Sequence, residues 1–281
     1  MCVECGCGAS GETGKTGLVL PHHHHPHDHE PSTPSPGKTV SAPSGHELSE
    51  GSRRLTVEQE ILGKNNRLAR DNRAFFLEHG ILVLNLLSGP GSGKTTLLER
   101  TIASLNGTIP LAVIEGDQET SRDADRIRQM GVQAVQINTG PGCHLDAHQV
   151  AHAAGDLDLS PGMLLVIENI GNLVCPALFD LGETARVVLF SVTEGEDKPL
   201  KYPRIFRDAD LTLLTKSDLL PHLEFDRARA ENSLRSVNPR GEILTLSART
   251  GEGMDRWLSW LASRKESAKG IPDTPLFGAG P

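Results

Sequence analysis

The segment from Ser88 to Thr96 constrains the fold of this chain more than any other. It reads Ser-Gly-Pro-Gly-Ser-Gly-Lys-Thr-Thr and directly follows an apolar run over residues 81–87. A buried strand, a glycine-rich turn and a following helix together form a phosphate-binding loop. Its backbone N–H groups surround phosphate oxygens, and the helix N-terminus adds partial positive charge. The predicted nucleotide-binding residues here are Gly89, Pro90, Gly91, Ser92, Gly93, Lys94, Thr95 and Thr96.

Two side chains of this loop have predicted chemical roles. The Lys94 ammonium is expected to reach the outer phosphates and act in catalysis, and the Thr95 hydroxyl to ligate Mg²⁺. The position five before Gly93 is Ser88 instead of glycine, so an ordinary glycine-rich turn is the alternative. A similar string at residues 11–16 follows no strand and is interpreted as flexible chain.

Further apolar runs of strand length recur along the chain, with helical stretches between them. Continuous apolar runs are typical of parallel strands that helices cover on both faces. The sequence therefore predicts an α/β fold with a mostly parallel sheet of about seven strands flanked by helices. The predicted strands are residues 81–87, 111–115, 132–137, 163–167, 186–192, 211–215 and 242–246.

Polar residues fall where these strands end, which is where ligands bind in such sheets. Asp117 follows one strand and is expected to support Mg²⁺ or orient the attacking water. Glu168 ends another strand, as does the metal-holding acid of the Walker B arrangement. We therefore predict Asp117 and Glu168 as catalytic and magnesium-binding residues, although strand-end acids also serve as helix caps or ion-pair partners.

Two later segments predict a guanine site. Residues 215–218 read Thr-Lys-Ser-Asp and resemble the Asn-Lys-x-Asp signature of GTPases, with Thr215 at the asparagine position. A carboxylate such as Asp218 accepts hydrogen bonds from guanine N1–H and the exocyclic amine, a pair that adenine does not offer. Ser247 and Ala248 resemble the Ser-Ala-Lys element behind the base. Lys216, Asp218, Ser247 and Ala248 complete the predicted nucleotide-binding set.

Charge and composition exclude several classes of function. The formal net charge is −8, which argues against nucleic acid or an anionic membrane as the main partner. No apolar stretch approaches the roughly 20 residues that span a bilayer. The N-terminus carries Glu4 and lacks the apolar region of a signal peptide. We expect a cytoplasmic protein.

The N-terminal segment is rich in soft metal ligands. Its first seven residues hold Cys2, Cys5 and Cys7, a Cys-x-x-Cys-x-Cys spacing that wraps one ion such as Ni²⁺ or Zn²⁺. A redox Cys-x-x-Cys pair is the alternative, but no βαβ pattern surrounds it. A histidine-rich tract follows, interrupted by proline and acid and therefore unlike a purification tag. It is expected to bind nickel weakly through His22, His23, His24, His25, His27 and His29.

Composition divides the chain into four regions. Residues 1–30 are the metal-binding segment, which we expect to be disordered, and residues 31–54 are a Pro/Ser/Gly-rich linker. Residues 55–265 form the nucleotide-binding domain, and residues 266–281 a disordered tail. The domain opens with a predicted helix over residues 55–78 whose partial apolar face, including Val57 and Ile61, is expected to pack on the core.

A second predicted metal site lies inside the domain. Cys143 and His144 are adjacent, and Cys175 follows the strand that ends at Glu168. If a helix begins near Cys143, His144, His148 and His152 share one face, which makes the latter two possible ligands. The helix dipole would then stabilise the Cys143 thiolate. Three donors leave a four-coordinate ion incomplete, so a second subunit would supply the rest.

These motifs together resemble the HypB family, the SIMIBI-class P-loop GTPases that accompany nickel insertion into [NiFe]-hydrogenase. The resemblance spans residues 55–265 and the first thirty, and includes Gly-Cys-His-Leu-Asp-Ala-His at 142–148 and Ser-Val-Thr-Glu-Gly-Glu-Asp-Lys-Pro at 191–199. It implies a GTP-hydrolysing nickel metallochaperone with GTP/GDP, Mg²⁺, Ni²⁺ and Zn²⁺ as its ligands. It also implies a homodimer when GTP is bound, with Cys143, His144 and Cys175 near the interface. The implied partners are a HypA-type zinc-containing chaperone and the hydrogenase large-subunit precursor.

Hydrolysis is expected to be slow, because the sequence reveals neither a clear catalytic base nor an arginine finger. Unassisted small GTPases turn over at rates on the order of 10⁻⁴ s⁻¹. Two alternatives remain open. One is a urease-type nickel chaperone GTPase, and the other is a nickel or zinc storage protein with a vestigial nucleotide site.

Overall fold

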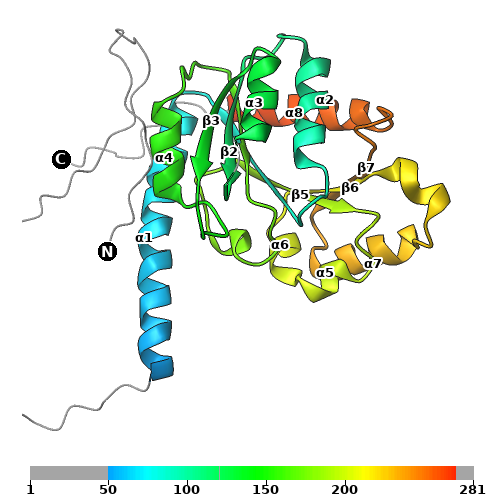
Figure 1. Cartoon of the computed structure of the whole chain (residues 1–281), viewed down its shortest axis with the longest axis horizontal. Coiled ribbons are helices and arrows are strands. Elements are labelled where there is room, and N and C mark those ends of the chain that lie inside the picture. Colours follow the sequence, from blue (N-terminus) through cyan, green and yellow to red (C-terminus); the bar gives the residue numbers. More distant parts are fainter. Residues whose placement is uncertain (1–49, 120, 270–281) are drawn as a thin grey trace, which may run out of the picture.

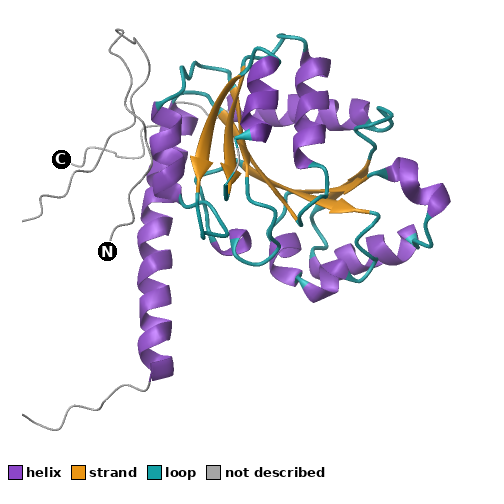
Figure 2. Cartoon of the chain, viewed as in Figure 1, coloured by secondary structure: helices purple, strands orange, loops and turns teal. Residues whose placement is uncertain are grey.

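The computed structural model describes residues 50–119 and 121–269. Several predictions lie outside these residues: the string at 11–16, the cysteines Cys2, Cys5 and Cys7, and the histidine tract from His22 to His29. Within the described residues, the chain forms one α/β unit in which helices lie on both faces of a twisted sheet (Figures 1 and 2).

Seven strands of the described part form a single sheet in the order β3-β2-β4-β1-β5-β6-β7, and every neighbouring pair is parallel. Each predicted strand is present, and its ends lie within two residues of the prediction. The sheet is thus entirely parallel, where the sequence predicted a mostly parallel one. The strands are β1 (Leu82–Ser88), β2 (Leu111–Asp117), β3 (Gln133–Asn138), β4 (Leu164–Glu168), β5 (Ala185–Ser191), β6 (Leu211–Thr215) and β7 (Glu242–Thr245).

Burial explains why these runs were recognisable. Every residue of β1, β4 and β6 is buried, because these strands have neighbours on both sides and helices above and below. A strand in that environment shows no alternation between apolar and polar residues. Edge strand β3 is only partly buried.

Helices divide between the two faces of the sheet. One face packs against α2 (Lys94–Leu105), α3 (Arg122–Gln129) and α8 (Met254–Lys269). The other face packs against α1 (Glu50–Glu78) and α4 (Ala147–Gly155) at one side, and against α6 (Pro203–Arg207) and α7 (Arg227–Val237) at the other. The remaining helices are α5 (Lys198–Lys201) and the 3₁₀ turns η1 (Pro176–Leu178) and η2 (Ser217–His222).

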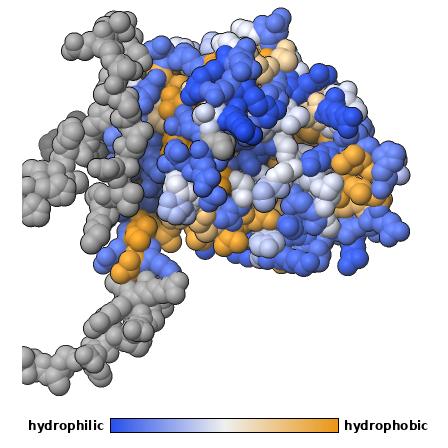
Figure 3. Space-filling model, in the orientation of Figure 1, coloured by the Kyte–Doolittle hydropathy of each residue, from blue (hydrophilic) through white to orange (hydrophobic). Residues whose placement is uncertain are grey.

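Helix α1 differs from the prediction in two ways. It begins at Glu50, inside the predicted linker, and α8 likewise continues to Lys269, into the predicted tail. The proposed packing of Val57 and Ile61 is wrong, since both side chains are 53% exposed. The helix extends past the domain at its N-terminal end, where Figure 3 shows apolar surface. Its C-terminal half packs instead, with Phe75 and Phe76 buried against α4 and the sheet.

Two buried asparagines attach α1 to the domain. Asn65 donates to the carbonyl oxygen of Asp180 (2.8 Å) and accepts from the Ala147 N–H (2.9 Å). Asn72, two turns later, donates to the carbonyls of Ala147 (2.8 Å) and Leu181 (3.1 Å). These amides satisfy backbone groups at the start of α4 and in the loop before β5. The start of α4 is thereby fixed, and with it the end of the loop that carries Cys143.

Within the described residues, no helix has the length and apolar character that crossing a bilayer requires.

Replacing Asn72 with alanine is expected to lower the free energy of unfolding by about 1–3 kcal/mol, because two buried carbonyls lose a donor. Chemical denaturation measures this, with exposed Asn66→Ala on the same helix as the control. Equal stabilities of the two variants would contradict the role given to Asn72.

Candidate functional site

The phosphate-binding loop has the predicted strand–turn–helix form. Strand β1 ends at Ser88, α2 begins at Lys94, and Gly91 and Gly93 take φ values of 73° and 97°, which favour glycine. The Lys94 Nζ donates to Ser88 Oγ at 2.9 Å. Burial lowers the pKa of Lys94, although the carboxylates of Glu168 and Glu115 oppose the shift. The lysine therefore lies inside the loop, where the sequence predicts that it reaches the outer phosphates.

Two other loops enclose the phosphate-binding loop. Glu194, which follows β5, accepts hydrogen bonds from Ser92 Oγ (2.6 Å) and from the Ser191 N–H (3.1 Å). The loop after β4 approaches from the other side, where a Cβ on Gly171 would lie 2.9 Å from Pro90 Cα. Sequence reasoning missed Glu194 as a contact of this loop. Its position three residues after the end of a central strand was the available signal.

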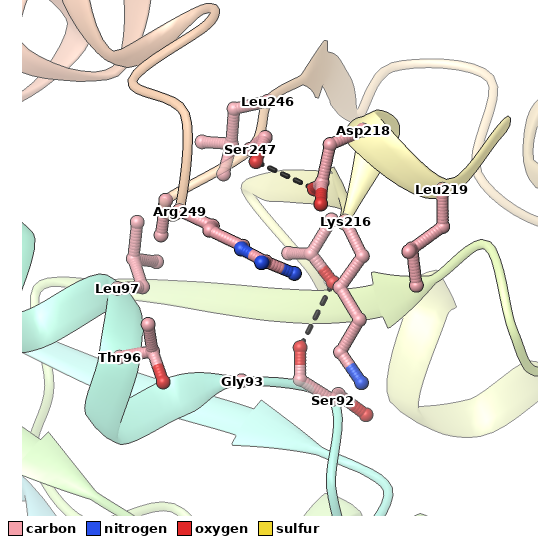
Figure 4. Close-up of a pocket in the computed structure, with 12 residues that line it drawn as sticks. Ser92, Gly93, Thr96, Leu97, Lys216, Asp218, Leu219, Leu246, Ser247 and Arg249 are labelled. Carbon is pink, nitrogen blue, oxygen red and sulfur yellow. Dashed lines mark hydrogen bonds between the residues drawn. The ribbon is translucent and has the colours of Figure 1, made fainter. Parts of the chain in front are cut away.

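The predicted guanine-binding residues surround one cavity of about 260 Å³ (Figure 4). Ser247 Oγ donates to Asp218 Oδ1 at 2.6 Å, which orients the carboxylate. Arg249 extends into the cavity between Leu97 and Asp218, and sequence reasoning had not assigned it. The lining residues are Ser92, Gly93, Thr96, Leu97, Thr215, Lys216, Asp218, Leu219, Leu246, Ser247, Ala248 and Arg249.

Thr215 and Lys216 connect this cavity to the phosphate-binding loop. The buried Thr215 hydroxyl donates to the Ser92 carbonyl at 2.9 Å. Lys216, at a left-handed φ of 60°, places its Nζ 2.7 Å from the Gly91 carbonyl. Both side chains hold the loop, so threonine at the usual asparagine position still serves to brace the site.

Buried acids lie beside the start of α2. Thr95 Oγ1 donates to Glu168 Oε1 at 2.7 Å, so a predicted magnesium ligand and the predicted strand-end acid are in contact. Glu115 of β2 lies opposite Glu168 in the strand register, and sequence reasoning had not assigned it. Burial raises the pKa of both carboxyl groups. The charge of Glu168 raises the pKa of Glu115 further, whereas the charge of Lys94 opposes the rise in the pKa of Glu168. Glu168 Oε2 is buried and lacks a hydrogen-bond donor among the described residues, so the donor set fits Mg²⁺.

The third predicted magnesium residue, Asp117, lies at the end of β2. Its Oδ1 accepts from the Glu119 N–H at 3.1 Å, and its carbonyl accepts from the Thr139 N–H at 3.0 Å. It thus begins a loop whose next residue, Gln118, reaches the loop that bears Cys143.

The predicted metal donors Cys143, His144 and Cys175 come together, with their ligand atoms within 4.8 Å of one another. Cys143 Sγ lies 3.7 Å from His144 Nδ1, and the His144 ring stacks on Phe179 at 3.8 Å between centroids. Two thiols and an imidazole suit Ni²⁺ or Zn²⁺. All three are partly exposed, which leaves room for a further ligand.

The predicted helix start near Cys143 is wrong. Helix α4 begins at Ala147, because Asp146 caps it: Asp146 accepts from the Gln149 N–H, and the Gln149 side chain accepts from the Asp146 N–H. His144 is therefore not on the helical face of His148 and His152, whose Nε2 atoms lie 3.1 Å apart. The expected stabilisation of the Cys143 thiolate by the helix is also wrong. The hydrogen bond with Cys175 raises the pKa of Cys143, and burial adds to the rise.

Two amide side chains connect the nucleotide loops to the metal donors. Gln118 Nε2, after β2, donates to the Gly142 carbonyl at 3.1 Å. Asn172 Nδ2, after β4, donates to the Cys143 carbonyl at 3.4 Å. Cys175 itself lies in this second loop, seven residues after Glu168. The metal donors are thus one hydrogen bond away from both loops that follow the acidic strand ends.

Comparison with known proteins places this geometry in a family. Residues 82–245 match the family model "CobW/HypB/UreG, nucleotide-binding domain". The chain is 54% identical over 286 aligned residues to the hydrogenase maturation factor HypB of Azotobacter vinelandii, covering 94% of this chain and 93% of that protein.

Two solved structures are also similar. The hydrogenase maturation factor HypB of Archaeoglobus fulgidus aligns with a TM-score of 0.68 and 39% identity, over 72% of this chain and 99% of that one. HypB of Helicobacter pylori in complex with nickel aligns with a TM-score of 0.70 and 38% identity, over 73% of this chain and 96% of that one. Family model, sequence identity and structure agree: the chain belongs to the HypB branch of the CobW/HypB/UreG family of nucleotide-binding proteins.

Proposed function

We propose that this protein is a GTP-hydrolysing nickel metallochaperone that serves maturation of [NiFe]-hydrogenase. The observation that carries the proposal is the pair of hydrogen bonds from Gln118 and Asn172 to the loop of Cys143. Through them, a change at the nucleotide phosphates displaces backbone beside the metal donors. The names of the similar proteins supply the hydrogenase context, and the nickel in the Helicobacter pylori structure supports the choice of metal.

In this mechanism the chain's own groups bind and orient GTP. The N–H groups of the phosphate-binding loop and Lys94 hold the phosphates, and Asp218, oriented by Ser247, selects guanine. Thr95, Glu168 and Asp117 would hold Mg²⁺, which neutralises charge on the transferred phosphoryl group when it is bound. Turnover without a partner is slow, in keeping with the unassisted rates of small GTPases.

Nickel is the ion that the protein delivers, and the bound nucleotide controls its release. Cys143, His144 and Cys175 bind Ni²⁺ or Zn²⁺, and a second copy of the chain in the GTP-bound dimer completes the coordination. The face that carries Cys143 suits such a contact, because a cavity of about 300 Å³ lies there among Pro90, Cys143 and Tyr202. The apolar side chain of Val174, which also lines this cavity, is 54% exposed and available for such a contact. Hydrolysis releases the loops after β2 and β4 and weakens the metal site.

Several parts of the proposal concern residues and partners outside the described chain. Cys2, Cys5 and Cys7 form a second nickel or zinc site, and the tract from His22 to His29 concentrates nickel. The protein acts in the cytoplasm with a HypA-type zinc-containing chaperone and the hydrogenase large-subunit precursor. A urease-type chaperone shares this mechanism, and the N-terminal cysteines favour the hydrogenase pathway.

Lys94→Ala is expected to lower the rate of GTP hydrolysis about 10²–10³-fold, because it removes a positioned charge from the outer phosphates. Phosphate release under saturating GTP measures the rate, and Lys64→Ala, on the exposed face of α1, is the charge-matched control. Equal rates for wild type and Lys94→Ala would instead support metal storage with a vestigial nucleotide site.

Asp218→Asn is expected to weaken GTP binding about 10–100-fold and to strengthen XTP binding, since an amide donor matches the C2 carbonyl of xanthine. Competition against a fluorescent guanine nucleotide measures both affinities. A preference of the wild type for ATP over GTP would refute the assignment of the base cavity.

Gln118→Ala combined with Asn172→Ala is expected to uncouple metal from nucleotide. Chelator competition measures nickel affinity with GDP and with a non-hydrolysable GTP analogue. The Cys2→Ser/Cys5→Ser/Cys7→Ser background removes the N-terminal thiols, and the chelator outcompetes the weakly binding histidine tract. The background protein should show an affinity difference of roughly fivefold or more between the nucleotides, and the double variant should lose it. A difference that survives both substitutions would show that these two bonds do not carry the coupling.

A further inference from the structure

Glu115 is a buried carboxyl group for which the mechanism above has no use. It lies in β2, directly after the apolar residues 111–114, and only 3% of the residue is exposed. Its register partner Glu168 is also 3% exposed, so two acids share one buried position of the sheet. Burying a carboxylate is costly unless an opposite charge or donors compensate it, and a second carboxylate beside it increases the cost.

The protein groups around this pair do not compensate it fully. Among the described residues, Glu115 Oε2 and Glu168 Oε2 are both buried without a hydrogen-bond partner. The positive group that faces them is Lys94, and its Nζ donates to Ser88 Oγ. Asp123, at the start of α3, faces the same lysine and adds further negative charge. The two carboxyl groups share a hydrogen bond with each other. Within the part of the chain that the structure describes, their Oε2 atoms remain buried without a donor, which is a feature of a cation site.

We propose that Glu115 is a second carboxylate of the divalent-cation site formed by Thr95 and Glu168, and that it sets the affinity of that site for Mg²⁺. The inference rests on the proposed function, since the cation in question accompanies the guanine nucleotide. Hard oxygen ligands at the start of α2 suit Mg²⁺, which is commonly held by one or two carboxylates and retained waters. Glu115 belongs to β2 and Glu168 to β4, so the cation joins the two strands whose following loops lead to Cys143.

The test measures how Mg²⁺ slows the release of a fluorescent GDP analogue, a readout that does not depend on hydrolysis. The purified full-length protein is loaded with the analogue and mixed with excess GDP at increasing Mg²⁺, and the midpoint concentration is compared between variants. Glu115→Gln should raise the midpoint about tenfold or more, as loss of a supporting carboxylate does at metal sites. Its release rate in EDTA should match that of the wild type, because glutamine preserves shape and the site then contains no cation.

Exposed Glu224→Gln, which makes the same change in net charge, is the matched control and should leave the midpoint unchanged. An unchanged midpoint in Glu115→Gln overturns the inference, as does release from the wild type that does not respond to Mg²⁺. Should Glu115→Gln fail to fold, Glu115→Asp replaces it, because the shorter side chain keeps the charge but moves its oxygens away from the cation site. A midpoint raised about threefold or more supports the inference, and an unchanged midpoint overturns it. Failure of the proposed function is distinct, because the wild type would then not bind the GDP analogue in EDTA.

Discussion

The site depends on the parallel pairing of β2, β4, β1 and β5. In a parallel sheet all carboxyl ends lie at one edge, so the loops that follow these strands meet there. The register between β2 and β4 places Glu115 opposite Glu168, and the register between β4 and β1 places Glu168 opposite Leu86, just before the phosphate-binding loop. Four segments that are far apart in sequence thereby share one small volume. Without that alignment the phosphate-binding loop would not lie beside Glu168, and Cys143 and Cys175 would not come together.

The arrangement is well suited to transmit a small displacement. Pro90 of the phosphate-binding loop lies against Gly171, and Asn172 donates to the Cys143 carbonyl. A path of packed backbone and one amide hydrogen bond therefore leads from the phosphate-binding loop to the backbone of Cys143. Because close-packed interiors deform little, a shift at one end of such a path appears at the other. The buried asparagines of α1 fix the far end of the Cys143 loop, and we therefore propose that displacement concentrates on Cys143 and His144.

Much of this fold could be predicted because its signals are local. Central parallel strands are largely apolar, and the phosphate-binding loop needs glycine at fixed positions, so both can be recognised in the sequence. Cys143 and His144 were predicted as metal donors from their adjacency and Cys175 from its place after the strand that ends at Glu168, and the structure brings the three together. The error at α4 was avoidable, since Asp146 and Gln149 have the spacing of a capping box. The proposed role of Glu115 was not predictable in the same way. It depends on the pairing of β2 with β4, which places Glu115 beside Glu168, 53 residues later in the sequence.

The central claim is that nucleotide state alters the coordination of metal by Cys143, His144 and Cys175. The most direct measurement is nickel K-edge X-ray absorption on protein in which Cys2, Cys5 and Cys7 are replaced by serine and the histidines from His22 to His29 by alanine. Spectra are recorded with GDP and with a non-hydrolysable GTP analogue. The account predicts that the number or length of nickel–sulfur contacts differs between the two nucleotides. Identical spectra, or nickel without sulfur ligands in both states, would contradict it.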